Sequence, residues 1–162
     1  MNVNATCILH VEDEDSDILL LQLAFSEAGI TVPVHVATDG QKAIDYLSGA
    51  GQYADRKQFP LPCLVLLDLK LPRKSGFEVL EWIRAQPILR RLVVIVLSSA
   101  EYECDIDQAY ELGANSYLVK PMDIAERQRM CRSLNAWWLG CNRFPVVREG
   151  REAPLRSGNS HP

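Results

Sequence analysis

The chain consists of short apolar runs that alternate with longer stretches of helical periodicity. The short runs occupy residues 7–11, 34–37, 63–67, 93–97 and 116–120. Residues 64–67 and 93–97 are apolar throughout, which is typical of strands that are buried on both faces of a sheet. Strands and helices in strict alternation favour a parallel sheet with helices on both faces. We therefore predict an α/β fold with five parallel strands.

The segments between these runs predict the helices. Residues 16–28 place apolar side chains at steps of three and four, with Ser16 as the expected cap and Gly29 as the stop. The connection over residues 49–62 is polar and longer than usual. Further helices are predicted over residues 39–48, 76–85, 104–112 and 124–139.

Composition excludes several classes of protein. A chain of 162 residues is long enough for one compact domain and leaves little room for a second. A net charge of -4 provides no basic surface for nucleic acid, and the longest apolar run is too short to cross a membrane. The amino terminus lacks the pattern of a signal peptide, and the five cysteines form no Cys-x-x-Cys pair. We expect a cytoplasmic protein with reduced thiols.

Polar residues follow four of the predicted strands at the point where each strand ends. They are Glu12, Asp13, Glu14 and Asp15 after the first strand, Asp68 after the third, Ser98 and Ser99 after the fourth, and Lys120 after the fifth. The carboxyl ends of parallel strands share one edge of the sheet, and sites in open α/β sheets lie there. We expect these side chains to converge.

The residue types at this edge suggest phosphoryl chemistry. Crowded carboxylates need a cation, and Mg²⁺ prefers oxygen ligands while keeping several waters. A carboxylate beside such a cation can attack a phosphoryl group and form an acyl phosphate. Lys120 would neutralise charge on the phosphoryl oxygens, and the Ser98 hydroxyl could donate to one of them.

Several motifs in this order resemble the receiver domains of two-component response regulators. The matching segments are Val11-Glu12-Asp13, Leu67-Asp68, Leu71-Pro72 with Gly76, Leu97-Ser98-Ser99-Ala100, Gly113-Ala114 and Lys120-Pro121. The resemblance covers residues 6–139 and implies the flavodoxin-like fold. Two further segments, Tyr53-Ala54-Asp55 and the ending Ala136-Trp137-Trp138-Leu139 with Phe144-Pro145, resemble stand-alone receivers that serve bacterial phytochrome histidine kinases.

The resemblance assigns a role to each matching position. Asp68 corresponds to the aspartate that accepts the phosphoryl group from a histidine kinase. Asp13 corresponds to a direct Mg²⁺ ligand, Glu12 to a ligand acting through water, and Lys70 to the residue whose carbonyl completes the metal site. The Lys70 side chain could also reach the phosphoryl group, or it could be an ordinary solvated lysine.

The remaining roles concern the response to phosphorylation. Lys120 corresponds to the lysine that contacts the phosphoryl group, Ser98 to the switch hydroxyl and Tyr117 to the switch aromatic residue. The family commonly has a cis bond at the position of Lys120-Pro121. The histidines carry no ligand spacing, and we interpret His10 as a hydrogen-bonded core residue.

Two other functions remain as alternatives. A phosphatase of the haloacid dehalogenase type also uses an aspartyl phosphate, but its Asp-x-Asp motif follows the first strand, where this chain has Glu12-Asp13. A receiver-like module that is never phosphorylated would not need the acidic pair, Asp68, Ser98 and Lys120. A receiver that signals without catalysing turnover of a substrate, and so is not an enzyme, is the interpretation we favour.

The end of the chain predicts self-association. We divide the sequence into a receiver domain at residues 1–140 and a tail at 141–162. Met130, Leu134, Trp137 and Cys141 form one stripe on the predicted last helix, and Trp138 lies about 100° away from Trp137. Because this apolar surface is wider than one docking face needs, we expect a homodimer built by the last helix and the tail. Output would then pass to a further, unknown protein.

Overall fold

The computed structural model describes residues 6–147 and contains the predicted parallel sheet. Its strands are β1 (Ile8–Val11), β2 (Val34–Ala37), β3 (Leu64–Leu67), β4 (Val93–Ser98) and β5 (Ser116–Val119). They lie in the order β2-β1-β3-β4-β5, and every neighbouring pair is parallel. This is the order of the flavodoxin-like doubly wound fold, so the predicted fold class is confirmed.

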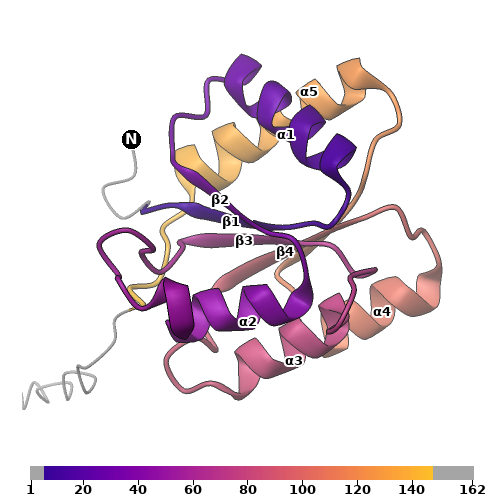
Figure 1. Cartoon of the computed structure of the whole chain (residues 1–162). Helices are drawn as coiled ribbons and strands as arrows, with labels where there is room; N and C mark the ends of the chain where they lie inside the picture. The colour runs from indigo at the N-terminus through magenta and orange to yellow at the C-terminus, as the bar shows by residue number, and fades with distance from the viewer. Residues whose placement is uncertain (1–5, 148–162) are drawn as a thin grey trace, which may run out of the picture.

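Helices cover both faces of the sheet (Figure 1). Helices α1 (Asp15–Glu27) and α5 (Ile124–Leu134) lie on one face, and α2 (Gly40–Ser48), α3 (Gly76–Ala85) and α4 (Glu103–Glu111) lie on the other. Alternate residues of each central strand therefore enter different cores: Leu64 and Leu66 pack towards α1 and α5, while Val65 and Leu67 pack towards α2 and α3. Within residues 6–147, no helix has the length and apolarity that a membrane span requires.

The long connection after α2 is more ordered than its polar composition indicates. It contains a short 3₁₀ helix, η1 (Gly51–Tyr53), and it buries an aromatic cluster. The rings of Tyr53 and Phe59 pack against each other and against Tyr46 of α2, with centroids 5.2 to 6.0 Å apart. The Arg56 guanidinium donates to the carbonyl oxygens of Tyr46 and Leu47 at 2.7 and 2.8 Å, which satisfies the end of α2.

The start of α1 differs from the prediction. Ser16 does not cap this helix: the helix begins at Asp15, and Glu14 occupies the N-cap position without a side-chain hydrogen bond. Two carboxylates in the first turn, those of Asp15 and Asp17, interact favourably with the positive end of the helix dipole instead. The chain therefore enters the helix directly from the acidic segment that follows β1.

The last helix is not one continuous α-helix, so the predicted stripe is wrong. The α-helix ends at Leu134 and continues as a π-helix, η2 (Asn135–Cys141). Bonds from i to i+5 widen the turn, so Leu139 rather than Trp137 lies beneath Leu134 in the core. Trp138 packs against this core, whereas Trp137 is 65% exposed.

The described part of the tail packs on its own domain. Phe144 is buried in the core under α1 and α5, and Val147 packs against the opposite core. The described chain thus passes from one face of the sheet to the other at the side of the molecule (yellow in Figure 1). Residues 148–162, which include most of the predicted dimer arm, lie outside the described residues.

Candidate functional site

Three carboxylates meet at the carboxyl edge of the sheet. Glu12 and Asp13 follow β1, and Asp68 follows the neighbouring strand β3. Each offers one oxygen atom, and these atoms lie within 4.8 Å of one another. Glu12 and Asp68 are buried, while Asp13 is more exposed. The parallel pairing of β1 and β3 thus brings these predicted ligands together.

Lys120 crosses the sheet edge from the end of β5 to reach these carboxylates. Its ammonium donates to Asp68 Oδ2 at 2.6 Å and to a carboxylate oxygen of Glu12. Burial opposes the charged form of the lysine, but the hydrogen bonds to Asp68 and Glu12 outweigh it and raise the pKa of Lys120 above its ordinary value. Lys120 is therefore a fixed positive charge beside the Asp68 carboxylate.

Two helix residues that the sequence analysis did not identify extend this ion-pair network. Asp17 of α1 accepts from Lys120 Nζ at 3.0 Å through Oδ2, and from Arg127 Nη2 of α5 at 3.1 Å through Oδ1. Burial would raise the pKa of Asp17, but the bond to Lys120 and the two positive charges lower it. Arg127 is buried although it lies on a helix with many exposed charges, and nothing in its sequence spacing indicates that burial.

His10 lies beneath the acidic pair on β1, 2% exposed. Burial and the charge of Lys120 lower the pKa of His10 to about 4, so its ring is neutral near pH 7. The expected burial is correct, but the expectation of a fully hydrogen-bonded ring is wrong: within residues 6–147 its Nδ1 atom has no hydrogen-bond partner. Glu12 above it is completely buried, and burial raises the pKa of its carboxyl group.

Ser98 and Tyr117 meet at a common backbone residue. The Ser98 hydroxyl, fully buried at the end of β4, accepts from the Ala100 amide at 3.3 Å. The Tyr117 hydroxyl donates to the Ala100 carbonyl oxygen at 2.9 Å. A movement of the loop after β4 would therefore affect both side chains.

The loop after Asp68 is shaped by close backbone contacts. The Lys70 amide donates to Asp68 Oδ1 at 3.2 Å, while the Lys70 side chain is exposed. Gly76 begins α3 so close to this loop that a Cβ atom there would lie 2.1 Å from the Asp68 carbonyl oxygen. Arg73, between them, has a φ of 66°, a left-handed conformation that few non-glycine residues adopt.

The bond between Lys120 and Pro121 is trans, which differs from the cis form that the family resemblance implied. The trans form of an X-Pro bond is intrinsically favoured by about 0.5–1 kcal/mol. In this form the Pro121 carbonyl oxygen accepts from Arg127 Nη2 at 3.1 Å.

The donor set fits a divalent cation. The carboxylates of Glu12, Asp13, Asp17 and Asp68 face two cationic groups, Lys120 and Arg127, which leaves an excess of two negative charges. The three clustered carboxylates offer hard oxygen ligands without histidine or cysteine, which is the chemistry that Mg²⁺ and Mn²⁺ prefer.

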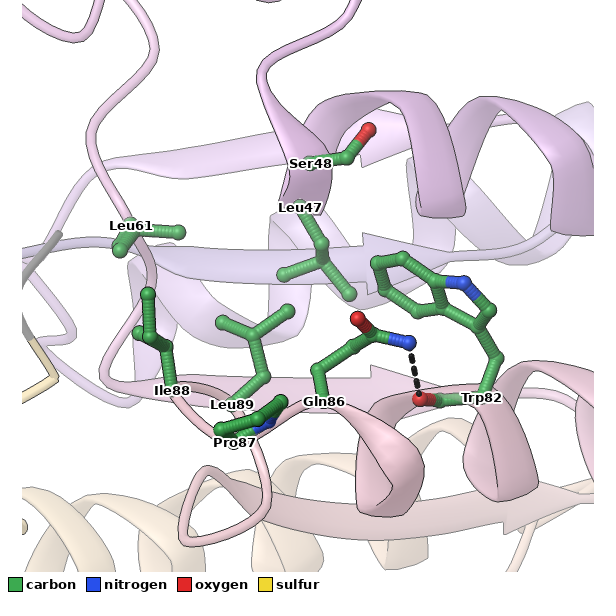
Figure 2. A pocket seen from close by; sticks show the side chains of 8 residues that line it. All are labelled: Leu47, Ser48, Leu61, Trp82, Gln86, Pro87, Ile88 and Leu89. Carbon is green, nitrogen blue, oxygen red and sulfur yellow. Dashed lines mark hydrogen bonds between the residues drawn. The ribbon is translucent and has the colours of Figure 1, made fainter.

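A pocket of about 220 Å³ lies at the opposite edge of the sheet. Figure 2 shows Leu47 from the end of α2 pointing towards Trp82 and Gln86 from the end of α3. Helices run antiparallel to the strands in this fold, so their carboxyl ends lie at the amino edge of the sheet. The pocket is therefore remote from Asp68 and does not provide the substrate cavity that the phosphatase alternative would need there.

The fold and site define a class of protein. The chain belongs to the response regulator receiver domain family, whose model matches residues 8–132. It is therefore a receiver-domain response regulator of two-component signalling, as the motifs predicted.

Particular relatives narrow this class. The chain is 38% identical over 141 residues to the probable methanogenesis regulatory protein FilR2 of Methanothrix harundinacea, covering 85% of this chain and 86% of the relative. It is 36% identical over 140 residues to the response regulator Rcp1 of Synechocystis, covering 86% of this chain and 93% of the relative.

The solved structures agree with this placement. The Mn²⁺-bound form of Rcp1 has a TM-score of 0.79 at 35% identity, covering 87% of this chain and 99% of that one. The phosphorylated cyanobacterial phytochrome response regulator RcpA has a TM-score of 0.81 at 35% identity, covering 88% and 99%. The predicted likeness to phytochrome-associated receivers is confirmed.

Proposed function

We propose that Asp68 accepts a phosphoryl group from the phosphohistidine of a sensor histidine kinase. The observation that carries this proposal is the buried Asp68 carboxylate, with Lys120 2.6 Å away and two further carboxylates beside it. A carboxylate oxygen of Asp68 attacks phosphorus while the bond from phosphorus to the histidine nitrogen breaks. The products are an aspartyl phosphate and a free imidazole, and Lys120 stabilises the charge on the phosphoryl oxygens.

A bound divalent cation belongs to this proposal, and we assign it as Mg²⁺. Asp13 and Asp68 would hold it directly, Glu12 through water, and the Lys70 carbonyl would complete the site. When bound, the cation neutralises the phosphoryl oxygens and lowers the repulsion between the carboxylates. The negative excess at the site and the Mn²⁺ in the structure of the relative Rcp1 both support this assignment.

Ser98 and Tyr117 form the proposed switch. Once Asp68 is phosphorylated, the Ser98 hydroxyl turns to donate to a phosphoryl oxygen and leaves the Ala100 amide. Because Tyr117 holds the carbonyl oxygen of the same residue, the loop after β4 and this ring then move together. The protein catalyses only its own phosphorylation and dephosphorylation.

Helix α1 presents the docking surface for the proposed kinase. Leu19 and Leu23, one turn apart on this helix, are 57% and 54% exposed. The helix starts directly after the acidic segment of the site, so a partner on this stripe could reach Asp68. The relative RcpA, named as a phytochrome response regulator, supports a phytochrome as that kinase. We place the reaction in the cytoplasm, where ATP supplies phosphorylated kinases.

We propose that the protein is a homodimer. Its output passes through contacts with another protein rather than with nucleic acid. Trp137 and Val146, both about half exposed or more, lie on the π-helix and on the described tail. Sedimentation should show a dimer for the whole chain and a shift towards monomer after Trp137→Ala or removal of residues 148–162. A monomer for the unchanged chain, with and without phosphorylation, would exclude the dimer.

Phosphorylation is tested with acetyl phosphate and Mg²⁺, followed by mass spectrometry. We expect a transient addition of one phosphoryl group that is lost in Asp68→Asn and retained in Asp107→Asn, a matched change at an exposed aspartate of α4. Undiminished labelling of Asp68→Asn would refute the assignment. Turnover of unrelated phosphoesters would favour the phosphatase alternative. Transfer from a panel of purified histidine kinases that includes a phytochrome would identify the donor.

A further inference from the structure

The Lys120 ammonium is shared by carboxylates of the site and of helix α1. Asp17 takes one of its bonds at 3.0 Å, and the second oxygen of Asp17 accepts from Arg127 at 3.1 Å. The same Arg127 nitrogen donates to the carbonyl oxygen of Pro121, directly after Lys120. The site is thereby tied to the contact between α1 and α5.

Phosphorylation forces a choice among these bonds. An ammonium has three donors, and Glu12, Asp68 and Asp17 already occupy them. A phosphoryl group on Asp68 adds oxygen acceptors, and the donor that bonds Asp68 can move to one of them. Lys120 can bond to a second phosphoryl oxygen only if it also releases Glu12 or Asp17.

Asp17 is the carboxylate that can be released at least cost. Glu12 is completely buried, and its close ion pair within residues 6–147 is with Lys120. The Asp17 side chain is 25% exposed and keeps its bond to Arg127 when Lys120 leaves. An uncompensated carboxylate is far more costly when it is buried than when it is partly solvated and paired.

We propose that Asp17 and Arg127 are positioning residues that set how readily Lys120 engages the phosphoryl group. This inference rests on the proposed phosphorylation of Asp68. Asp17 competes with the phosphoryl oxygens for the Lys120 ammonium. Arg127 weakens that competition by sharing the charge of Asp17, and it holds the turn after β5 through Pro121.

Opposite changes in rate follow from this arrangement. Asp17→Asn removes the competing charge and should speed the formation of the acyl phosphate. With acetyl phosphate at saturating Mg²⁺, the rate should rise about threefold, which corresponds to the free energy of a partly exposed ion pair. Arg127→Gln leaves the full charge of Asp17 on Lys120 and should slow the reaction, while Arg127→Lys should restore it. Asp15→Asn is the matched control, because Asp15 is an exposed carboxylate in the same helical turn.

The double variant distinguishes an effect of Arg127 that acts through Asp17 from an effect of net charge alone. If Arg127 acts through Asp17, the Asp17→Asn/Arg127→Gln protein should react as fast as Asp17→Asn alone. If the two residues act only by net charge, their effects should cancel and the double variant should react like the unchanged protein. That result, or an unchanged rate in Asp17→Asn, would overturn the inference. Absence of labelling in the unchanged protein would instead refute the proposed function. Thermal unfolding of each variant verifies that it is folded.

Discussion

Replacement of Lys120 by methionine tests whether this lysine neutralises the buried carboxylates. Methionine keeps an unbranched apolar side chain but removes the ammonium that contacts Asp68 at 2.6 Å and that also bonds to Glu12. The Glu12 and Asp68 side chains are 0% and 7% exposed, so water cannot replace the lost bonds. Asp17 is 25% exposed and retains Arg127, and we therefore assign the main loss to Glu12 and Asp68.

The size of this loss follows from the general behaviour of buried ion pairs. Removing one partner of a buried pair lowers the free energy of unfolding by about 3–5 kcal/mol. For a chain of this length, that corresponds to a decrease in melting temperature of roughly 6–20 °C. Thermal and urea unfolding in a chelating buffer should show this decrease. Lys70→Met, which removes an exposed lysine near the same site, should change the free energy of unfolding by less than about 0.5 kcal/mol.

Two conditions should reduce the loss of stability in Lys120→Met. Mg²⁺ should restore more stability to this variant than to the unchanged protein, because the cation takes over the neutralising role. Lower pH should also reduce the difference in free energy of unfolding between Lys120→Met and the unchanged protein. Burial already raises the pKa of Glu12 above its ordinary value, and loss of the Lys120 bond raises it further. The folded variant then binds a proton that the unfolded chain releases, so its free energy of unfolding falls as pH rises above about 4.5.

A small loss of stability that depends on neither pH nor Mg²⁺ would refute this reasoning. A loss below about 1 kcal/mol in chelating buffer, independent of pH and of Mg²⁺, would mean that the carboxylates do not depend on Lys120. Equal losses in Lys120→Met and Lys70→Met would lead to the same conclusion, because net charge alone would then account for both.

Three further outcomes can be checked by unfolding and labelling experiments. Gly76→Ala should lower stability by about 2 kcal/mol or more and impair labelling by acetyl phosphate, because the new Cβ would collide with the backbone of the phosphorylation loop. At a protein concentration where the chain is monomeric, Trp138→Ala should lower the free energy of unfolding by about 2–3 kcal/mol, whereas Trp137→Ala should change it by less than about 0.5 kcal/mol. Equal effects would contradict the described burial of the two rings. A thiol reagent should label exposed Cys104 and Cys141 rapidly and the three buried cysteines only after unfolding, and a faster third thiol would contradict the described burial.

The strands and the residues at their ends could be predicted because the information for them is local. A run such as residues 64–67 is apolar on both faces, and both faces are buried in the structure. Parallel pairing then determines where the next residues lie. Asp68 follows β3 and Glu12 follows β1, and the aligned strands leave them at one edge. Lys120 reaches the same edge from β5.

The end of α5 could not be predicted from spacing, because helical spacing assumes bonds from i to i+4. Here the backbone changes to i to i+5 bonding after Leu134, and the change is set by tertiary packing. Leu139 and Phe144 fill the core beside Leu134, which turns Trp137 outwards. The order within the long connection after α2 could not be predicted for a similar reason: its few aromatic residues are dispersed among polar ones in sequence and meet only when the chain folds.

The positions of Asp17 and Arg127 depend on a contact between two helices that are far apart in the sequence. Asp17 lies in the first turn of α1 and Arg127 in the first half of α5, and their interaction requires these helices to lie side by side on one face of the sheet. A buried arginine needs a carboxylate nearby, and Asp17 needs a second cation if Lys120 is to leave it. Neither requirement is visible in the hydrophobic pattern. We therefore expect the behaviour of Lys120 to depend on the helices packed around it as well as on the motif residues at the strand ends.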